Sequence, residues 1–280
     1  MKDFVSVIIP FYNDGEYIQE SVNSVLNQTY SNIEIIIVDD GSDDANSIKI
    51  LNQIEFPNLK KIRIAHHGPS AARNKAIEIC NGEWILPLDA DDTIESTYIA
   101  KAVYIMKTNS NMGIVYCLAD QFGEAKGPWQ LPQFNMGKML LNNIIFVTAL
   151  FRKKDWDKIG GFDETFEHGI EDYDFWLSIL GLGRNVYQIP ECLFHYRIKK
   201  KSRNKNIGNS MDLLKGYFAI IQNKHRNLYI ENFDQFANEI RNAFIEEQYK
   251  CKTLHTKYKI KKYISKLKRK IINLIIRKQR

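Results

Sequence analysis

The fold is decided by the stretch EWILPLDADD, residues 83–92. Its apolar part is short enough for one buried strand, and three carboxylates follow it within four residues. Asp89, Asp91 and Asp92 repel one another unless a cation lies between them, and oxygen ligands at the end of a strand suit Mg²⁺ or Mn²⁺. The alternative is an acidic surface turn, in which Asp92 or Thr93 caps the helix that follows.

Strands and helices alternate along the first 120 residues. β-branched runs predict strands, and apolar residues at helical spacing between these runs predict helices. The expected strands cover residues 4–10, 33–38, 61–65, 83–88 and 113–117, and the expected helices cover residues 17–26, 43–53, 70–79 and 95–107, with Ser70 as an N-cap. This order predicts a mostly parallel sheet with helices on both faces.

Side chains suited to a ligand follow several of these strands. Tyr12 follows the first strand, Asp39 and Asp40 follow the second, and Arg73 lies in the first turn of a helix. Cations are disfavoured at that end of a helix, so Arg73 faces an anion such as phosphate or belongs to a structural ion pair. Since the carboxyl ends of parallel strands share one edge, these groups could hold a nucleotide there, although Tyr12 alone also fits a core or rim aromatic.

The second half of the chain brings a further pair of acids. A strand is expected at residues 146–151 and a helix that ends at Gly160. His168 then precedes Glu171 and Asp172, which begin a helix, and the helix dipole alone favours acids at this position. Two amphipathic helices are expected to follow and to pack on the preceding domain.

The composition is that of an ordinary globular protein. The chain has 280 residues, of which 44% are hydrophobic, enough for one large domain with an appendage or for two domains. The four cysteines lack metal-ligand spacing, which favours a reducing compartment and buried thiols over disulfides or zinc. The apolar run before Pro10 is too short for a signal peptide or a membrane span, so a cytoplasmic location is expected.

The net charge of +6 is unevenly divided. Thirteen of the 39 basic residues and no acidic residue lie in residues 250–280, which leaves 26 basic against 33 acidic residues in the rest of the chain. Residues 260–275 place apolar side chains on one helix face and Lys and Arg on the other. This pattern favours a helix that lies on an anionic membrane surface, with a partner-binding or oligomerising helix as the alternative.

Four stretches resemble, in order, the successive motifs of family 2 glycosyltransferases with the GT-A fold. They are residues 5–13, 38–42, 68–74 and 88–92, and the resemblance continues through residues 160–164 and 171–177 to about residue 205. It implies an α/β fold of the GT-A type, in which a Rossmann-like, mostly parallel central sheet is flanked by helices, with a C-terminal helical extension.

The resemblance also implies a division of the chain. Residues 1–205 would form the catalytic domain, with a nucleotide-sugar half at about 1–120 and an acceptor half at about 121–205. Residues 206–280 would form a helical region that ends in the basic amphipathic helix.

By this similarity, one edge of the sheet binds a UDP-sugar. Pro10 and Tyr12 would lie against the uracil, Asp39 would accept a hydrogen bond from it, and Arg73 would lie near the base and the phosphates. The triplet 89–91 matches the family's DxD element, whose acids meet the ribose and the metal-bound diphosphate.

The metal ligands implied by the resemblance come from the same acidic run. Asp91 is the favoured ligand, and Asp92 is a close second. Residues 193–199 resemble the family's YRxH element, but Lys199 stands where a histidine often does, so the role of that histidine has no counterpart here. His195 is a further candidate for a metal or phosphate contact, with a partly buried structural histidine as the favoured alternative.

Lys199 begins a run of basic residues that allows two interpretations. The run either closes over the diphosphate as a loop or is simply solvated. Its members are Lys199, Lys200, Lys201 and Arg203.

The catalytic base is the last part that the resemblance supplies. Asp172 would take the proton from the acceptor hydroxyl, and Glu171 would be a supporting carboxylate or an acceptor contact. Mn²⁺ or Mg²⁺, together with Arg73, would stabilise the leaving diphosphate. Direct attack opposite the leaving group would invert the anomeric carbon.

The expected function is therefore a metal-dependent, inverting hexosyl- or N-acetylhexosaminyltransferase. It would move a sugar from a UDP-sugar to a hydroxyl of a glycan or lipid-linked acceptor in surface polysaccharide synthesis, such as that of O-antigen or capsule. The QxxRW element of processive members does not occur, which favours transfer of a single sugar. Residues 250–280 would hold the enzyme at the inner face of the cytoplasmic membrane, with no nucleic-acid partner.

Three other classes of protein were weighed against this function. A phosphoacceptor receiver domain also has acids at parallel strand ends, but it would end soon after the fifth strand and would leave Glu171 and Asp172 unexplained. A nucleic-acid-binding module could use the basic tail, although the body of the chain is acidic. A protein of the same fold could also bind the nucleotide sugar without turnover.

Overall fold

The computed structural model describes residues 3–166, 169–200 and 211–253. The strands are β1 (Val5–Phe11), β2 (Ile33–Asp40), β3 (Leu59–Ile64), β4 (Trp84–Pro87), β5 (Thr93–Ile94), β6 (Met112–Gly123), β7 (Gly127–Trp129), β8 (Leu150–Arg152) and β9 (Asn185–Ile198). The helices are α1 (Ile18–Leu26), α2 (Ala45–Gln53), α3 (Pro69–Ile79), α4 (Tyr98–Thr108), α5 (Met136–Leu141), α6 (Lys153–Ile159), α7 (Glu171–Gly181), α9 (Met211–Lys224) and α10 (Arg226–Glu231).

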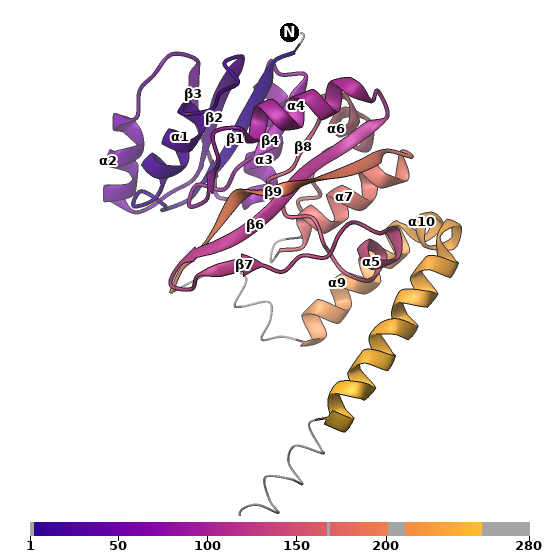
Figure 1. Cartoon of the computed structure of the whole chain (residues 1–280). Helices are drawn as coiled ribbons and strands as arrows, with labels where there is room; N and C mark the ends of the chain where they lie inside the picture. The colour runs from indigo at the N-terminus through magenta and orange to yellow at the C-terminus, as the bar shows by residue number, and fades with distance from the viewer. Residues whose placement is uncertain (1–2, 167–168, 201–210, 254–280) are drawn as a thin grey trace, which may run out of the picture.

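One mixed sheet organises the molecule. Its order is β3-β2-β1-β4-β8-β6-β9-β5, with β7 paired to β6. The strands β3, β2, β1 and β4 run parallel, as do β6 and β9, and the pairings of β8, β7 and β5 are antiparallel. Figure 1 shows the long β6–β9 pair crossing the molecule between the N-terminal strands and the C-terminal helices. The prediction of a mostly parallel sheet flanked by helices is confirmed.

The N-terminal strands are buried because apolar, often β-branched side chains fill both of their faces. Six of the seven residues of β1 are buried, and α3 packs against β1 and β2. The register runs from Val5 opposite Ile33 to Phe11 opposite Asp39, so β1 and β2 end together. Parallel pairing therefore brings the groups that follow β1, β2 and β4 to one edge of the sheet.

Two predicted helix caps are wrong. Gly68, with φ of 89°, is the N-cap of α3, and the hydroxyl of Ser70 is buried with no hydrogen-bond partner. Neither Asp92 nor Thr93 caps a helix, because Thr93 and Ile94 form β5 instead, paired with β9, and α4 begins only at Tyr98. The interpretation of the acidic run as a surface turn is also wrong, since Asp92 is buried.

The expected elements of the second half are mostly present. The helix that ends at Gly160 is confirmed, and Gly160 lies in the left-handed region with φ of 84°. The helix that begins at Glu171 is also confirmed. The strand expected at residues 146–151 is reduced to β8, because only Leu150 to Arg152 pair with neighbouring strands.

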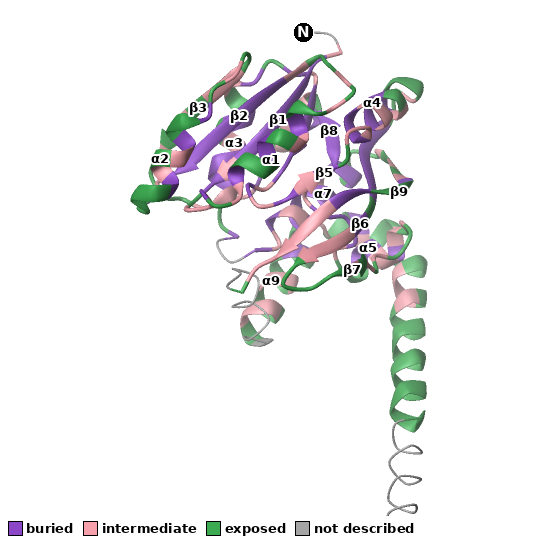
Figure 2. Ribbon diagram, turned by 60° about the vertical axis from the view of Figure 1, so that its left-hand side comes forward, coloured by how far each residue is buried: buried purple, intermediate pink, exposed green. Residues whose placement is uncertain are grey.

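The C-terminal helices differ in how they pack. α9 and α10 lie on the body and bury Ile221 and Leu228. Residues 233–253 form a further helix. It projects from the body, and most of its residues are exposed (Figures 1 and 2). The prediction that this second helix packs on the body is wrong for Ile240 and Phe244, which are exposed.

Some sequence predictions concern residues outside the described ranges. They include His168, the basic residues Lys201 and Arg203, and the tail beyond residue 253. The proposed boundary at about residue 205 also lies there and stays a prediction. No helix among the described residues is long and apolar enough to cross a membrane. Cys80 and Cys117 are buried as expected, whereas Cys192 and Cys251 are exposed.

A buried carboxylate joins α9 to α7 and gives a test of this packing. Asp174 accepts a bond of 2.8 Å from Lys224 Nζ and lies 2.7 Å from His225 Nε2. We expect Asp174→Asn to lower the free energy of unfolding by about 2 kcal/mol, because it removes the buried carboxylate that accepts from Lys224 and pairs with the largely buried His225. Urea unfolding followed by circular dichroism measures the change.

The matched control for this experiment is Asp212→Asn. Asp212 is fully exposed on α9, the helix that carries Lys224, and lies 4.0 Å from Lys215. Its replacement should leave the urea midpoint unchanged. Equal midpoints for the Asp174 and Asp212 variants would contradict the anchoring role of Asp174.

Candidate functional site

A cavity of about 480 Å³ lies between the acidic run and the start of α7. Its charged wall contains Arg73, Asp89, Asp92, Glu171 and Asp172. The opposite wall is largely apolar and aromatic and includes Trp129, Phe146, Phe194 and Tyr196. Such a cavity, apolar with a few convergent polar groups, is typical of a small-molecule site.

Arg73 is the central charge of this cavity. Its Nη1 donates to Glu171 Oε1 at 2.9 Å, and its Nη2 donates to Asp89 Oδ1 at 2.8 Å, while the residue is only 2% exposed. Burial alone would lower the pKa of Arg73, but the charges of Asp89 and Glu171 outweigh it and hold that pKa above its usual value. The structural ion pair expected as one alternative is present, and because α3 begins at Pro69, Arg73 lies just beyond its first turn.

Asp172 is the second residue of α7 and lies beside the ion pair of Arg73 and Glu171. Its Oδ1 accepts from the backbone N–H of Tyr173 at 2.8 Å, and its Oδ2 accepts from Asn143 Nδ2 at 3.0 Å. Burial, followed by the charge of Glu171, raises the pKa of Asp172 to about 7, although Arg73 acts in the opposite direction. A carboxyl with that pKa can gain or lose a proton near neutral pH.

The turn that leads into α7 is strained. Ile170, the N-cap, has φ of 60°, which is unusual for a β-branched residue. Strain of this kind costs on the order of 1 kcal/mol or more and persists where the surrounding structure fixes it. It sets the direction in which the first turn presents Glu171 and Asp172 to the cavity.

The groups expected to hold a base gather at the ends of β1 and β2. Pro10 lies in β1, and Tyr12 follows it, 39% exposed and stacked on His66 with ring centroids 4.2 Å apart. Asp39 is buried and accepts bonds from the backbone N–H of Ser42 and from Arg63 Nη1.

Each acid of the run 89–92 already has an internal partner. Asp89 is bonded to Arg73, Asp91 Oδ2 lies 2.7 Å from Lys199 Nζ, and Asp92 Oδ1 accepts the backbone N–H of Arg197 at 2.8 Å. Burial raises the pKa of Asp91, while Lys199 lowers it in part. Burial and then the charges of Asp91 and Asp89 raise the pKa of Asp92 well above its usual value.

These contacts do not fit the divalent ion expected from the sequence. Asp91 Oδ2 already faces the ammonium group of Lys199, and Asp92 Oδ1 holds the backbone amide of Arg197. A cation does lie beside the acids, as their mutual repulsion requires, but it is the side chain of Lys199.

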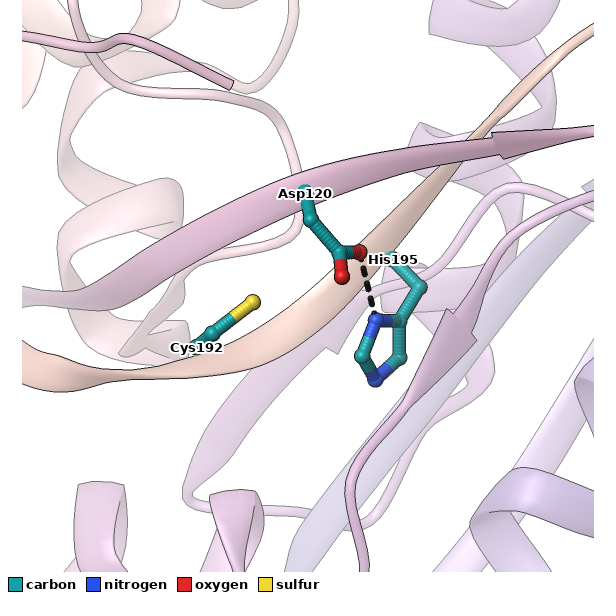
Figure 3. Close-up of side chains that lie close together, drawn as sticks. All are labelled: Asp120, Cys192 and His195. Atoms are coloured by element: carbon teal, nitrogen blue, oxygen red, sulfur yellow. Dashed lines mark hydrogen bonds and ion pairs between the residues drawn. The ribbon is translucent and has the colours of Figure 1, made fainter. Parts of the chain in front are cut away.

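His195 is not brought together with Asp91 and Asp92 as a ligand set. Its Nδ1 lies 2.6 Å from Asp120 Oδ1 and its Nε2 lies 3.2 Å from Glu95 Oε1. Figure 3 shows the imidazole turned toward the Asp120 carboxylate. Side chains alternate along a strand, and Phe194 and Tyr196 line the cavity, so His195 lies on the other face of β9.

His195 belongs instead to a different group of potential ligands. Among the described residues, Asp120, Cys192 and His195 form the one group of three whose ligand atoms lie within 4.8 Å of one another. Cys192 is exposed, and the imidazole already bonds to Asp120 and Glu95. This placement accords with the structural histidine that was the favoured alternative.

Four residues of the site were not found from the sequence as contacts. Arg63 and His66 border the edge that carries Tyr12, Asn143 holds Asp172, and Arg197 holds Asp92. No local pattern marks Asn143, which lies in a loop after α5. The sequence does contain an indication for Arg63. A basic residue in a strand, next to a strand that ends in acidic residues, suggests a cross-strand ion pair.

Comparison with known proteins agrees with this geometry. Residues 6–171 match the family described as glycosyl transferase family 2, which is more than half of the chain. The chain belongs to glycosyl transferase family 2. Members of this family typically depend on a divalent metal.

Two individual proteins are similar to the chain in sequence. It is 33% identical over 216 residues to the Escherichia coli UDP-Glc:alpha-D-GlcNAc-diphosphoundecaprenol beta-1,3-glucosyltransferase WfaP, covering 73% of this chain and 81% of that protein. It is 28% identical over 244 residues to the chondroitin synthase of Pasteurella multocida, covering 84% of this chain. The chain spans only 25% of that synthase.

The structure of Staphylococcus aureus TarS 1–349 in complex with UDP-GlcNAc is similar in fold. The TM-score is 0.63 at 19% sequence identity, and the match covers 84% of this chain and 79% of the TarS chain. The expectation of an α/β fold of the GT-A type is confirmed by this likeness and by the family match.

The buried pairing of Arg73 leads to a stability test. Arg73→Met should lower the free energy of unfolding by about 3 kcal/mol, because it removes the cation that is bonded to the buried Glu171 and to the half-buried Asp89. Adding Glu171→Gln to that variant should recover part of the loss, since it removes one of the stranded charges. Urea unfolding of the two single variants and the double variant measures both effects.

Lys75→Met is the control on the same helix, because Lys75 pairs with Glu78 at the exposed surface. It should leave the urea midpoint near that of the native protein. Strict additivity of Arg73→Met and Glu171→Gln would contradict the coupling that the ion pair implies.

Proposed function

We propose that the chain is an inverting glycosyltransferase that moves a single sugar from a UDP-sugar to a hydroxyl group of a glycan or lipid-linked acceptor. The observation that carries this proposal is Asp172, a carboxyl with a pKa near 7 that borders a cavity beside the Arg73 pair. A proton acceptor next to a site for an anionic donor is what such a transfer needs.

The donor class is supported by geometry and by likeness. Tyr12 and His66 offer an exposed aromatic surface at the end of β1, and Asp39 lies buried in β2 opposite Phe11. A base stacked there would direct its diphosphate toward Asp89 and Asp91 and its sugar toward the cavity. The names of WfaP and of the TarS complex contain UDP-glucose and UDP-GlcNAc, respectively, which supports a UDP-sugar here.

In the proposed mechanism Asp172 accepts the proton of the acceptor hydroxyl. Asn143 and the backbone N–H of Tyr173 each hold one oxygen of the carboxylate and so fix its direction. As the proton moves, the hydroxyl oxygen attacks the anomeric carbon from the side opposite the diphosphate. The bond from that carbon to the diphosphate breaks, and UDP leaves with the electron pair.

Arg73 has a different part in this mechanism. Its guanidinium holds Asp89 and Glu171 in place at the wall of the cavity and keeps a fixed positive charge near the developing charge of UDP. Fixed charges in a site of low exposure need no reorganisation during the reaction. No step is assigned to Mn²⁺ or Mg²⁺, because the acidic run does not fit the ion as it stands.

The acceptor is proposed to be a glycan or a saccharide on a lipid carrier used in surface polysaccharide synthesis, such as that of O-antigen or capsule. The name of WfaP specifies a GlcNAc-diphosphoundecaprenol acceptor, which supports a lipid-linked substrate. The aromatic wall with Trp129 and Tyr196 suits a sugar ring, since apolar faces of sugars pack on aromatic side chains.

The base assignment predicts a pH dependence. Below a pH of about 7, Asp172 is protonated and cannot accept a proton, so kcat/KM for transfer should fall as the pH drops through 7. Asp172→Asn should lower kcat by about 1000-fold and leave UDP affinity within about threefold. Transfer is measured with a panel of UDP-sugars and a lipid-linked saccharide acceptor, and UDP binding by calorimetry.

Glu95→Gln is a control for this variant, since Glu95 is an exposed acid outside the cavity. It should keep both the rate and the pH profile. Full turnover by Asp172→Asn would refute the base, and UDP binding without turnover of any sugar would favour a binding protein of the same fold.

The basic tail is proposed to bring the enzyme to an anionic membrane surface. Residues 250–280 carry thirteen basic residues and no acidic ones. The full chain should sediment with vesicles that contain anionic phosphatidylglycerol and remain in solution with neutral phosphatidylcholine vesicles. Salt at about 0.5 M should release it from the anionic vesicles, because the salt screens the attraction between the basic residues and the lipid headgroups. Binding to duplex DNA but not to anionic vesicles would contradict the proposal.

A further inference from the structure

Lys199 places a positive charge between two acidic side chains, Asp14 and Asp91. It directly follows β9, and its Nζ is 2.7 Å from Asp91 Oδ2 and 2.8 Å from Asp14 Oδ1. Asp14 follows β1, and Asp91 follows β4. One ammonium group therefore joins the two loops between which the diphosphate of a donor would run.

The backbone that carries Lys199 is held in place by the contacts of Arg197. Two residues earlier, the backbone N–H of Arg197 donates to Asp92, and its Nε donates to the backbone carbonyl of Asp91 at 2.7 Å. The Arg197 guanidinium also lies over the rings of Tyr17 and Phe122, at 4.8 and 4.2 Å from the ring centroids. These contacts clamp the end of β9 onto the acidic run.

The ammonium is both charged and accessible. A lysine that lies against two carboxylates carries its ordinary positive charge. The side chain of Lys199 is 23% exposed and that of Asp14 is 24% exposed. An ammonium on a flexible stem can keep Asp91 and exchange Asp14 for a phosphate oxygen, because its donors rotate.

A divalent ion would compete with this arrangement. An Mg²⁺ ion binds a carboxylate oxygen at about 2.1 Å, and Asp91 Oδ2 is already 2.7 Å from Nζ. An ion on that oxygen would lie against the ammonium, so one of the two cations would have to leave. The clamp through Arg197 favours the lysine.

We propose that Lys199 is the resident cation of the donor site, which contacts the diphosphate in place of a divalent metal, so that donor binding needs no metal. This inference rests on the proposed function as a UDP-sugar transferase. It assigns to the chain a fixed charge that neither has to be acquired nor can be removed by a chelator.

The experiment measures binding of UDP to the full chain by calorimetry, first in EDTA and then with Mn²⁺. The native protein should bind UDP in EDTA, with an affinity within about threefold of that in Mn²⁺. Lys199→Met should weaken binding in EDTA by about tenfold or more, since it removes a charge-assisted contact to phosphate. Lys199→His should bind weakly in EDTA and recover in Mn²⁺, because an imidazole can ligate the ion and leaves Asp91 open to it.

Lys101→Met is the control, because Lys101 is a surface lysine on α4 that is paired with Glu191 and belongs to no part of the proposed donor site. It should bind UDP as the native protein does in both solutions. The urea midpoints of all variants are measured to confirm that each is folded.

The outcomes separate this inference from the function on which it rests. UDP binding by the native protein only in Mn²⁺, or equal binding by Lys199→Met and the native protein in EDTA, overturns the resident cation and leaves the transferase standing. Failure of the native protein to bind UDP in either solution overturns the proposed donor and the inference together.

Discussion

The structure depends on one buried guanidinium. Arg73 reaches from the second turn of α3 to Asp89, just after β4, and to Glu171, at the start of α7. Its two ion pairs therefore tie a helix of the N-terminal half to the acidic loop and to a helix far along the chain. The cavity exists between these elements because Arg73 sets the distance between them.

The same pattern recurs along the edge of the sheet. Asp39 is paired with Arg63, and Asp91 is paired with Lys199. Parallel strands that end together concentrate carboxylates at this edge, and each would repel the next without a cation. The fold meets this constraint with side chains of its own, and the site is already partly neutralised before a donor arrives. This preorganisation lowers the cost of binding an anion beside acids.

The sequence predicts the strands, the helices and the acids that follow them, because these features depend on neighbours along the chain. Val5 to Pro10 form a strand by their own preferences, and Asp39 ends one strand and Asp91 follows another whatever lies across from them. The partners of these acids depend on the course of the backbone. Lys199 meets Asp91 only because β5 and β9 pair at Thr93 and His195. Thr93 therefore lies in a strand and not at the expected helix cap, and no local sequence pattern predicts its pairing with His195.

The projecting helix has a thermodynamic consequence. Residues 233–253 expose large apolar side chains, including Phe233, Phe244 and Tyr249, and only the end near Phe236 packs on α10. A helix with so little tertiary packing has marginal stability in water. Any surface that covers those side chains would stabilise the helical conformation as it binds. The helical content of residues 233–253 and their binding to that surface would therefore be coupled.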